Sequence, residues 1–245
     1  MLVEIAIGDA YGASFEFAPE KFVETHNSGE LYVKHHSRDI KPGCYTDDTQ
    51  MSLALVEMIL DDVEFTPLNV ADKFVEVYKR DPREGYGAIY KLLNDKNVKS
   101  GIALLRRIQP FSEKNGSMMR AVPLGIIKDH NRVLETAAIQ SMVTHCHPDA
   151  ILASQITALL SHWAIYHWND GEPMDLFQLM SFMECISPSI KDGFASLILS
   201  DIESPVPCHA MKTLRAVLGV LHYSNSLKGV LVDSCSLQGD TDSVA

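Results

Sequence analysis

Apolar residues recur at the spacing of a buried helical stripe along most of this sequence, and that periodicity restricts the fold more than any other feature. After Asp48, apolar residues stand at positions 51, 54, 55, 58 and 59, which is the i, i+3, i+4, i+7 pattern of an amphipathic helix. Strand-like alternation is scarce, and no internal repeat or low-complexity segment interrupts the pattern. The sequence therefore predicts an all-α fold, a compact orthogonal multi-helix bundle in a single domain over residues 1–245.

Turn and capping signals set the expected helix boundaries. Thr66-Pro67 is typical of a helix start, because proline fits the first helical turn. Loops are expected at residues 17–44, with a short extended piece at 31–33, and at residues 169–174. A last helix follows Asn225-Ser226 and ends at Cys235; the other predicted helices cover residues 49–60, 67–79, 88–93, 101–110, 133–143, 149–168, 175–186, 189–200 and 208–223.

Composition excludes several classes of protein. The net charge of −11 argues against a nucleic-acid surface, because Lys and Arg supply that kind of binding. The five cysteines form no Cys-x-x-Cys pair, and no secretory signal is evident, so we expect reduced thiols in a cytoplasmic protein. Without a run of 18 apolar residues the chain is not expected to span a membrane. We also expect a monomer.

Acidic residues gather near both ends of the sequence. Asp47-Asp48 lies between two threonines at the start of the periodic stretch, and Gly239-Asp240-Thr241-Asp242-Ser243 lies near the other end. Together they offer an all-oxygen donor set, which suits Mg²⁺, Mn²⁺ or Ca²⁺ and is a poor match for zinc. The alternative is that Asp47-Asp48 and its threonines only cap a helix, whose N-terminus favours these residue types.

Three further motifs complete the pattern. Gly8-Asp9-Ala10-Tyr11-Gly12 precedes Glu16, and its glycines are also compatible with simple helix packing. The run from Asn115 to Arg120 predicts a glycine-containing loop entering a helix, where free backbone N–H groups favour a diphosphate. Thr144-His145 follows a predicted helix, and His145 is either a ligand contact or a capping or core histidine.

Taken in sequence order from residue 8 to residue 243, these five motifs resemble those of the ADP-ribosylglycohydrolase family. Its members include the dinitrogenase-reductase-activating glycohydrolases and the ADP-ribosyl-acceptor hydrolases. The resemblance implies two Mg²⁺ (or Mn²⁺) ions, one bound by Thr46, Asp47, Asp48 and Asp242, and the other by Asp240, Asp242 and Ser243. It also implies Glu16, Asp240 and Asp242 as catalytic residues and, as contacts of ADP-ribose, Asn115, Gly116, Ser117, Met118 and His145.

The function implied by this resemblance is divalent-metal-dependent hydrolysis. The enzyme would remove ADP-ribose from modified protein side chains by cleaving the glycosidic bond at the distal ribose, with Glu16 as acid or base or as a gate to the metals. One alternative is a catalytically silent relative that binds ADP-ribose or has a structural role, although such a protein has no need of four clustered acids. A two-metal phosphohydrolase would use the same donors but release phosphate. The acceptor linkage and the preferred ion stay open.

The sequence departs from the family in one respect. In the family a helix follows the Asp-Thr-Asp-Ser motif, whereas this sequence stops at Ala245. We therefore expect Asp240, Asp242 and Ser243 to lack their usual helical support, which affects the second metal position more than the first.

Overall fold

The computed structural model describes residues 1–87, 89–168, 174–224 and 226–245. Over these residues the chain is helical and contains no β-strand, and its only sheet-like pairings are two isolated bridges, Lys114 with His209 and Val206 with Gly239. The described helices include none that is both long and apolar enough to cross a membrane. The all-α prediction is confirmed.

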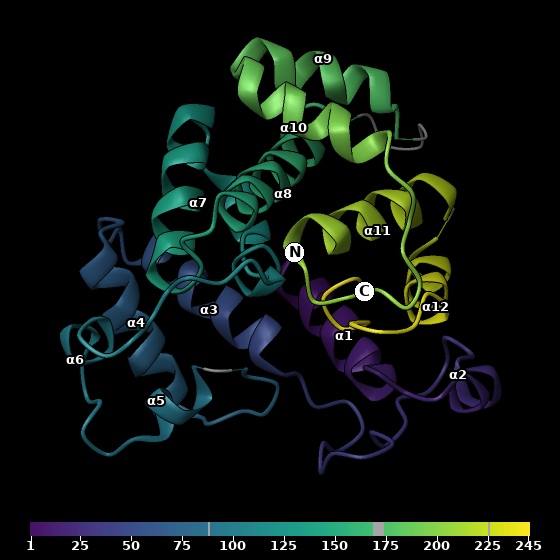
Figure 1. Cartoon of the computed structure of the whole chain (residues 1–245), viewed down its shortest axis with the longest axis horizontal. Helices are drawn as coiled ribbons and strands as arrows, with labels where there is room; N and C mark the ends of the chain where they lie inside the picture. Colours follow the sequence, from purple (N-terminus) through teal and green to yellow (C-terminus); the bar gives the residue numbers. More distant parts are fainter. Residues whose placement is uncertain (88, 169–173, 225) are drawn as a thin grey trace.

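Twelve α-helices and three short 3₁₀ helices are present in the described residues (Figure 1). The α-helices are α1 Leu2–Gly12, α2 Glu20–His26, α3 Asp47–Leu60, α4 Pro67–Arg80, α5 Tyr90–Asn94, α6 Gly101–Leu105, α7 His130–Thr144, α8 Pro148–Tyr166, α9 Leu176–Ile186, α10 Pro188–Ile198, α11 Ala210–Tyr223 and α12 Leu227–Ser236. The 3₁₀ helices are η1 Ala13–Phe15, η2 Asn115–Ser117 and η3 Val122–Ile126.

The packing of these helices brings α1 and α3 together. Helix α8 crosses the middle of the molecule and packs against α7 and α11, while α3 packs against both α4 and α1 (Figure 1). The main core is apolar and fully buried, and it includes Leu55, Phe74, Leu124, Ile156 and Leu214. A smaller cluster joins α1 to α12. As a result, the start of α3 lies close to the end of α1.

The two ends of the chain also meet (Figure 1). Gly12 lies so close to the last residues that a Cβ atom there would stand 2.5 Å from the carbonyl oxygen of Thr241. The Thr241 hydroxyl donates to the carbonyl of Gly12 at 2.8 Å, and the Phe17 N–H donates to the carbonyl of Gly239 at 2.7 Å. Helix α1 therefore supports the Asp-Thr-Asp-Ser segment, in place of a helix following it.

Several predicted boundaries differ from the structure. Helix α2 forms inside the segment expected to be loop, directly after Pro19, and residues 31–33 form no strand. The predicted helix over 101–110 ends at Leu105. The Asn115 loop enters only a three-residue 3₁₀ turn, not an α-helix, so no long helix dipole points at a ligand there. Ala88, residues 169–173 and Asn225 lie outside the described residues.

Candidate metal centre

Asp9 caps the start of α3 from outside that helix. Its carboxylate accepts the backbone N–H of Thr46 at 2.8 Å and of Thr49 at 3.0 Å, as well as the hydroxyls of both threonines. These N–H groups have no partner within their own helix, so a buried carboxylate satisfies them. The alternative that Asp47 and Asp48 serve as the caps is not supported, because Asp9 already does so.

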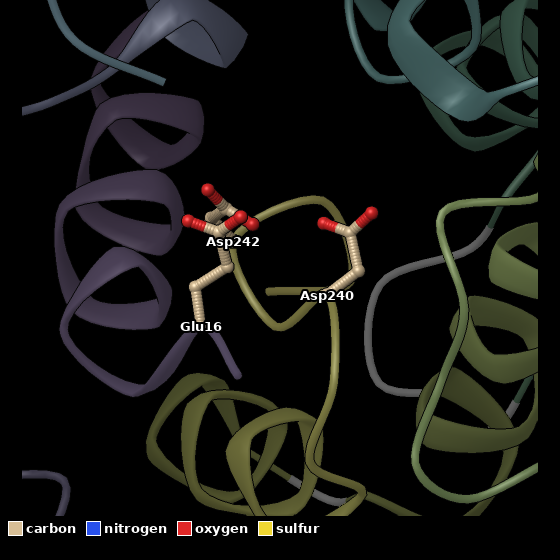
Figure 2. Close-up of side chains that lie close together, drawn as sticks. All are labelled: Glu16, Asp240 and Asp242. Atoms are coloured by element: carbon tan, nitrogen blue, oxygen red, sulfur yellow. The ribbon is translucent and has the colours of Figure 1, made fainter. Parts of the chain in front are cut away.

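Three buried carboxylates meet beside this helix start. One oxygen each from Glu16, Asp240 and Asp242 lies within 4.8 Å of the other two. Figure 2 shows the three side chains directed toward the same space, with Asp240 and Asp242 on one loop and Glu16 arriving from a separate segment. Glu16 follows η1, and the Phe17–Gly239 hydrogen bond fixes its backbone beside that loop. Segments from opposite ends of the sequence thus make one cluster.

The position of Asp240 and Asp242 depends on the backbone of the preceding glycine. Gly239 has a φ of +81°, and a Cβ atom there would lie 2.1 Å from the carbonyl oxygen of Val206. The bridge to Val206 continues through the Asp240 N–H, which donates to the same carbonyl at 3.0 Å. Only glycine fits both the dihedral angle and the close approach.

The aspartates of α3 complete the acidic cluster. The Ser243 hydroxyl donates to Asp48 Oδ1 at 3.1 Å, which joins the two predicted metal motifs directly. Asp47, Asp48 and Ser243 line the same cavity as Glu16, Asp240 and Asp242, and its volume is about 550 Å³. Gly85 from the 81–87 loop packs against the Asp47 carboxylate and closes that side.

The electrostatics of this cluster favour a cation. Burial raises the pKa of Asp47, Asp48 and Asp242 well above its ordinary value, and neighbouring carboxylates raise each further. Among the ion pairs of the described residues, none involves Asp47, Asp48, Asp240 or Asp242. Buried carboxylates without a cation are costly, so a bound divalent ion would stabilise this arrangement.

Among the described residues, Glu16 is the one member of the cluster that forms an ion pair with a basic side chain. Arg38 binds it with two nitrogens, at 2.5 Å and 3.1 Å. Burial raises the pKa of Glu16 to about 7, the charge of Arg38 opposes this shift, and Asp240 adds to it. Sequence reasoning missed Arg38, because a charged residue in an irregular loop 22 positions away carries no periodic or motif signal.

Three of the predicted substrate contacts line the same cavity. Asn115 donates through Nδ2 to Asp240 at 2.8 Å and to the Thr213 hydroxyl at 3.0 Å. Gly116 packs against the imidazole of His145. Asn115, Gly116 and His145 all line the cavity that the carboxylates line, so the ligand loop, residues 115–118, and the acidic cluster share one space.

Three other predicted residues have side chains turned away from that cavity. The Thr46 hydroxyl is buried on Asp9, and the Ser117 hydroxyl accepts from Ser141 within the core. Met118 lines a second, mainly apolar cavity of about 380 Å³, and both cavities are lined by Asp48, Met119, Asp242 and Ser243. Ser117 and Met118 do not line the first cavity.

His145 is held neutral by its surroundings. Burial lowers its pKa to about 3, and nearby Arg120 and Lys114 act in the same direction. The Thr144 hydroxyl lies 2.7 Å from Nδ1 of His145 and accepts a hydrogen bond from Arg120 at 2.6 Å. In the tautomer whose Nδ1 accepts the proton of this hydroxyl, Nε2 of His145 is an N–H donor.

Arg120 braces the ligand loop rather than the carboxylates. It donates to the side chain of Gln140 at 2.6 Å and to Thr144, and its guanidinium lies 4.6 Å from the centre of the Phe74 ring. Burial lowers its pKa to about 9.

Comparison with known proteins identifies the family of the chain. The sequence model of the family described as ADP-ribosylglycohydrolase matches residues 1–245. The chain belongs to the ADP-ribosylglycohydrolase family. A solved structure, described as an ADP-ribosylglycohydrolase-related protein complex, superposes with a TM-score of 0.72 at 23% identity, covering 99% of this chain and 81% of that one. That likeness shows that the two chains share the fold.

Curated members of this family align over most of the chain. ADP-ribosylhydrolase ARH3 of Xenopus tropicalis is 29% identical over 89% of this chain and 63% of its own length. ADP-ribosylarginine hydrolase Tri1 of Pseudomonas putida (strain GB-1) is 25% identical over 100% of this chain and 66% of its own length. The chain thus spans less than two thirds of the length of the curated relatives it matches.

Proposed function

We propose that this protein is a divalent-metal-dependent hydrolase that removes ADP-ribose from modified protein side chains by cleaving the glycosidic bond at the distal ribose. The observation that carries the proposal is the convergence of Glu16, Asp47, Asp48, Asp240 and Asp242 on one cavity, which the ligand loop also lines. Membership of the ADP-ribosylglycohydrolase family and the hydrolase activities for which its relatives are named support the same reaction.

The residues present fit two Mg²⁺ or Mn²⁺ ions. Every donor in the cluster is a carboxylate or hydroxyl oxygen, as these hard cations prefer, and no nitrogen or sulfur ligand competes among the proposed donors. Asp47, Asp48 and Asp242 would bind one ion, and Asp240, Asp242 and Ser243 would bind the other. The Thr46 hydroxyl is left out of the first set, because it is buried on Asp9. When bound, such ions lower the pKa of a water molecule and orient substrate hydroxyls.

The side chains around this centre supply the remaining chemistry. With a pKa of about 7, Glu16 is suited to give or take a proton as the glycosidic bond breaks. Asn115 holds the Asp240 carboxylate in place through its side-chain amide. The Nε2 N–H of neutral His145 would donate to a diphosphate oxygen of ADP-ribose beside Gly116.

A release assay tests the proposal. The purified protein would be incubated with arginine-linked and serine-linked ADP-ribosylated peptides, in Mg²⁺, in Mn²⁺ and in EDTA, and free ADP-ribose measured. We expect release in the metal-containing samples and none in EDTA, with recovery when metal is restored. Binding of ADP-ribose without release would instead identify a silent relative, and release of inorganic phosphate would identify a phosphohydrolase.

A further inference from the structure

The Arg38–Glu16 pair is a two-point contact at the edge of the acidic cluster. Nη1 of Arg38 lies 2.5 Å from Oε2 of Glu16, and Nη2 lies 3.1 Å from Oε1, so both carboxylate oxygens are engaged. A bidentate pair of this kind fixes the plane of a carboxylate as well as its position. The Glu16 side chain is 10% exposed and that of Arg38 is 40% exposed, so the arginine covers the glutamate from the solvent side.

The loop that carries Arg38 is held by a neighbouring histidine. Nδ1 of His35 accepts the backbone N–H of Ser37 at 3.0 Å and of Arg38 at 2.9 Å. Because Nδ1 accepts both bonds, the ring proton is on Nε2, which is buried and has no hydrogen-bond partner in the described structure. The imidazole is 4% exposed and stacks on His36. A buried polar side chain thus closes a tight turn immediately before Arg38.

No second basic side chain among the described residues pairs with Glu16. Arg38 is its only ion-pair partner among the described residues, and the nearby Asp240 carboxylate would otherwise repel a charged Glu16. The other ion pair of the same loop, between Lys34 and Asp39, is 3.6 Å long and largely exposed. Exposed pairs of that kind contribute little to structure.

We propose that Arg38 is a positioning residue of the active site, which orients the Glu16 carboxylate for the reaction, and that His35 fixes the turn from which Arg38 reaches it. The inference rests on the proposed hydrolase function, since its kinetic consequence needs a reaction at Glu16. Its structural part, the order of the turn and of the guanidinium group, is independent of any activity.

The kinetic test is a double-mutant cycle on release of ADP-ribose. We expect Arg38→Ala to lower kcat by about ten- to hundredfold, because displacement of a reacting group by about 1 Å has effects of that size. KM should change less than about twofold, and Arg38→Lys should recover only part of the loss, since an ammonium makes no two-point contact. In a Glu16→Gln background, Arg38→Ala should cost little more, because Arg38 acts only through Glu16. Lys34→Ala is the matched control and should behave as wild type.

The structural test uses NMR on the same variants without substrate. We expect slow rotation of the Arg38 guanidinium in the wild type and fast rotation in Glu16→Gln. The amides of Ser37 and Arg38 should exchange with solvent faster in His35→Leu than in His35→Asn, whose side-chain oxygen replaces the Nδ1 acceptor. If the wild type releases no ADP-ribose but the guanidinium rotation and the amide exchange rates change as expected, the proposed function fails and the structural part of the inference stands. Unchanged kcat in an active Arg38→Ala enzyme, or an equal loss in the Glu16→Gln background, would overturn the proposal.

Discussion

The hydroxyl of Ser243 donates to Asp48 Oδ1 at 3.1 Å, although the two residues are 195 positions apart in the sequence. This contact joins the start of α3 to the last segment of the chain. Helix α1 makes the junction possible, because Asp9 caps α3 and Gly12 packs against Thr241. The acidic cluster is therefore a product of the tertiary fold, and changes at either end should affect the same site.

Removing Asp48 should abolish metal binding at the α3 side of the cluster. We expect Asp48→Ala to weaken Mn²⁺ binding by more than about tenfold, since loss of even an outer-shell partner costs about that much. Release of ADP-ribose should fall at least as far. Asp61→Ala, at the far end of the same helix, is the control. Titration calorimetry measures the affinity, and equal binding by the Asp48→Ala variant and the control would contradict the assignment.

The stabilisation of the protein by Mg²⁺ should grow as pH rises. The pKa values of Asp47, Asp48 and Asp242 are raised in the folded state, so the metal-free fold binds protons more tightly than the unfolded chain does. The contribution of these three carboxyl groups to the stability of the metal-free fold is therefore greatest below the unfolded pKa of about 4 and falls as pH rises through the folded values. Mg²⁺ competes with those protons, and binding to the folded state raises its stability.

Thermal unfolding measures this effect. We expect the increase in Tm caused by Mg²⁺ to be larger at about pH 8 than at about pH 5, with KCl at matched ionic strength as the control for screening. A shift in Tm that is constant or shrinks with rising pH would argue against carboxylate ligands with raised pKa values.

Acid should destabilise the protein partly through His145. Its folded pKa is lowered to about 3 from an ordinary value of 6.5, so the unfolded chain binds the proton more readily between these values. The contribution of the neutral ring is thus complete above about pH 6.5 and is lost as pH falls, by at most about 1.4 kcal/mol per pH unit. Urea unfolding from pH 7 to pH 5 should show a shallower pH dependence for His145→Gln. Parallel curves for the two proteins would count against a buried neutral histidine.

Gly239→Ala should destabilise the fold. The left-handed backbone and the contact with Val206 leave no room for a Cβ atom, and backbone strain of this kind costs about 1–3 kcal/mol before any displacement of Val206. Gly87→Ala is the matched control, because a Cβ atom there would meet nothing within 4 Å. Denaturant unfolding of both variants gives the comparison. Equal stabilities would show that the 239–242 segment can rearrange freely.

Asn115 should support the second metal position by holding Asp240. The substitution Asn115→Ala removes two hydrogen bonds donated by the Asn115 amide, one to the Asp240 carboxylate at 2.8 Å and one to the Thr213 hydroxyl at 3.0 Å. Because outer-shell partners of this kind tune metal sites, we expect Mn²⁺ affinity and the rate of release to fall by about ten- to hundredfold. Thr213→Val should have a smaller effect, since Asp240 keeps its donor. A larger loss of Mn²⁺ affinity in Thr213→Val than in Asn115→Ala would contradict the proposal that Asn115 holds Asp240.

The helices were predictable from local signals where a stripe and a cap coincide. Helix α4 was expected over 67–79 and covers Pro67–Arg80, with Thr66 accepting the N–H of Asn69 as its cap. Boundaries failed where tertiary contacts decide them. Helix α2 has a single buried residue, Val23, so no stripe marks it. Residues 107–109, which follow the end of α6, line the cavity instead of continuing that helix.

The candidate site was predictable in its acids but not in their neighbours. The motifs marked Asp47, Asp48, Asp240 and Asp242, because paired carboxylates near hydroxyls are chemically distinctive. Nothing local marked Arg38, since its role depends on a loop whose course is set by His35 and by packing against η1. Thr46, Ser117 and Met118 belong to the right segments, but the direction of each side chain follows from helix geometry and burial, which a motif does not specify.

The central claim is that both ends of the chain bind the same divalent ions. Anomalous diffraction from crystals of the protein grown with Mn²⁺ locates such ions without reference to activity. We expect anomalous peaks between the carboxylates of Asp48 and Asp242 and beside Asp240. Well-diffracting crystals at neutral pH and millimolar Mn²⁺ that show no peak among these carboxylates would contradict it.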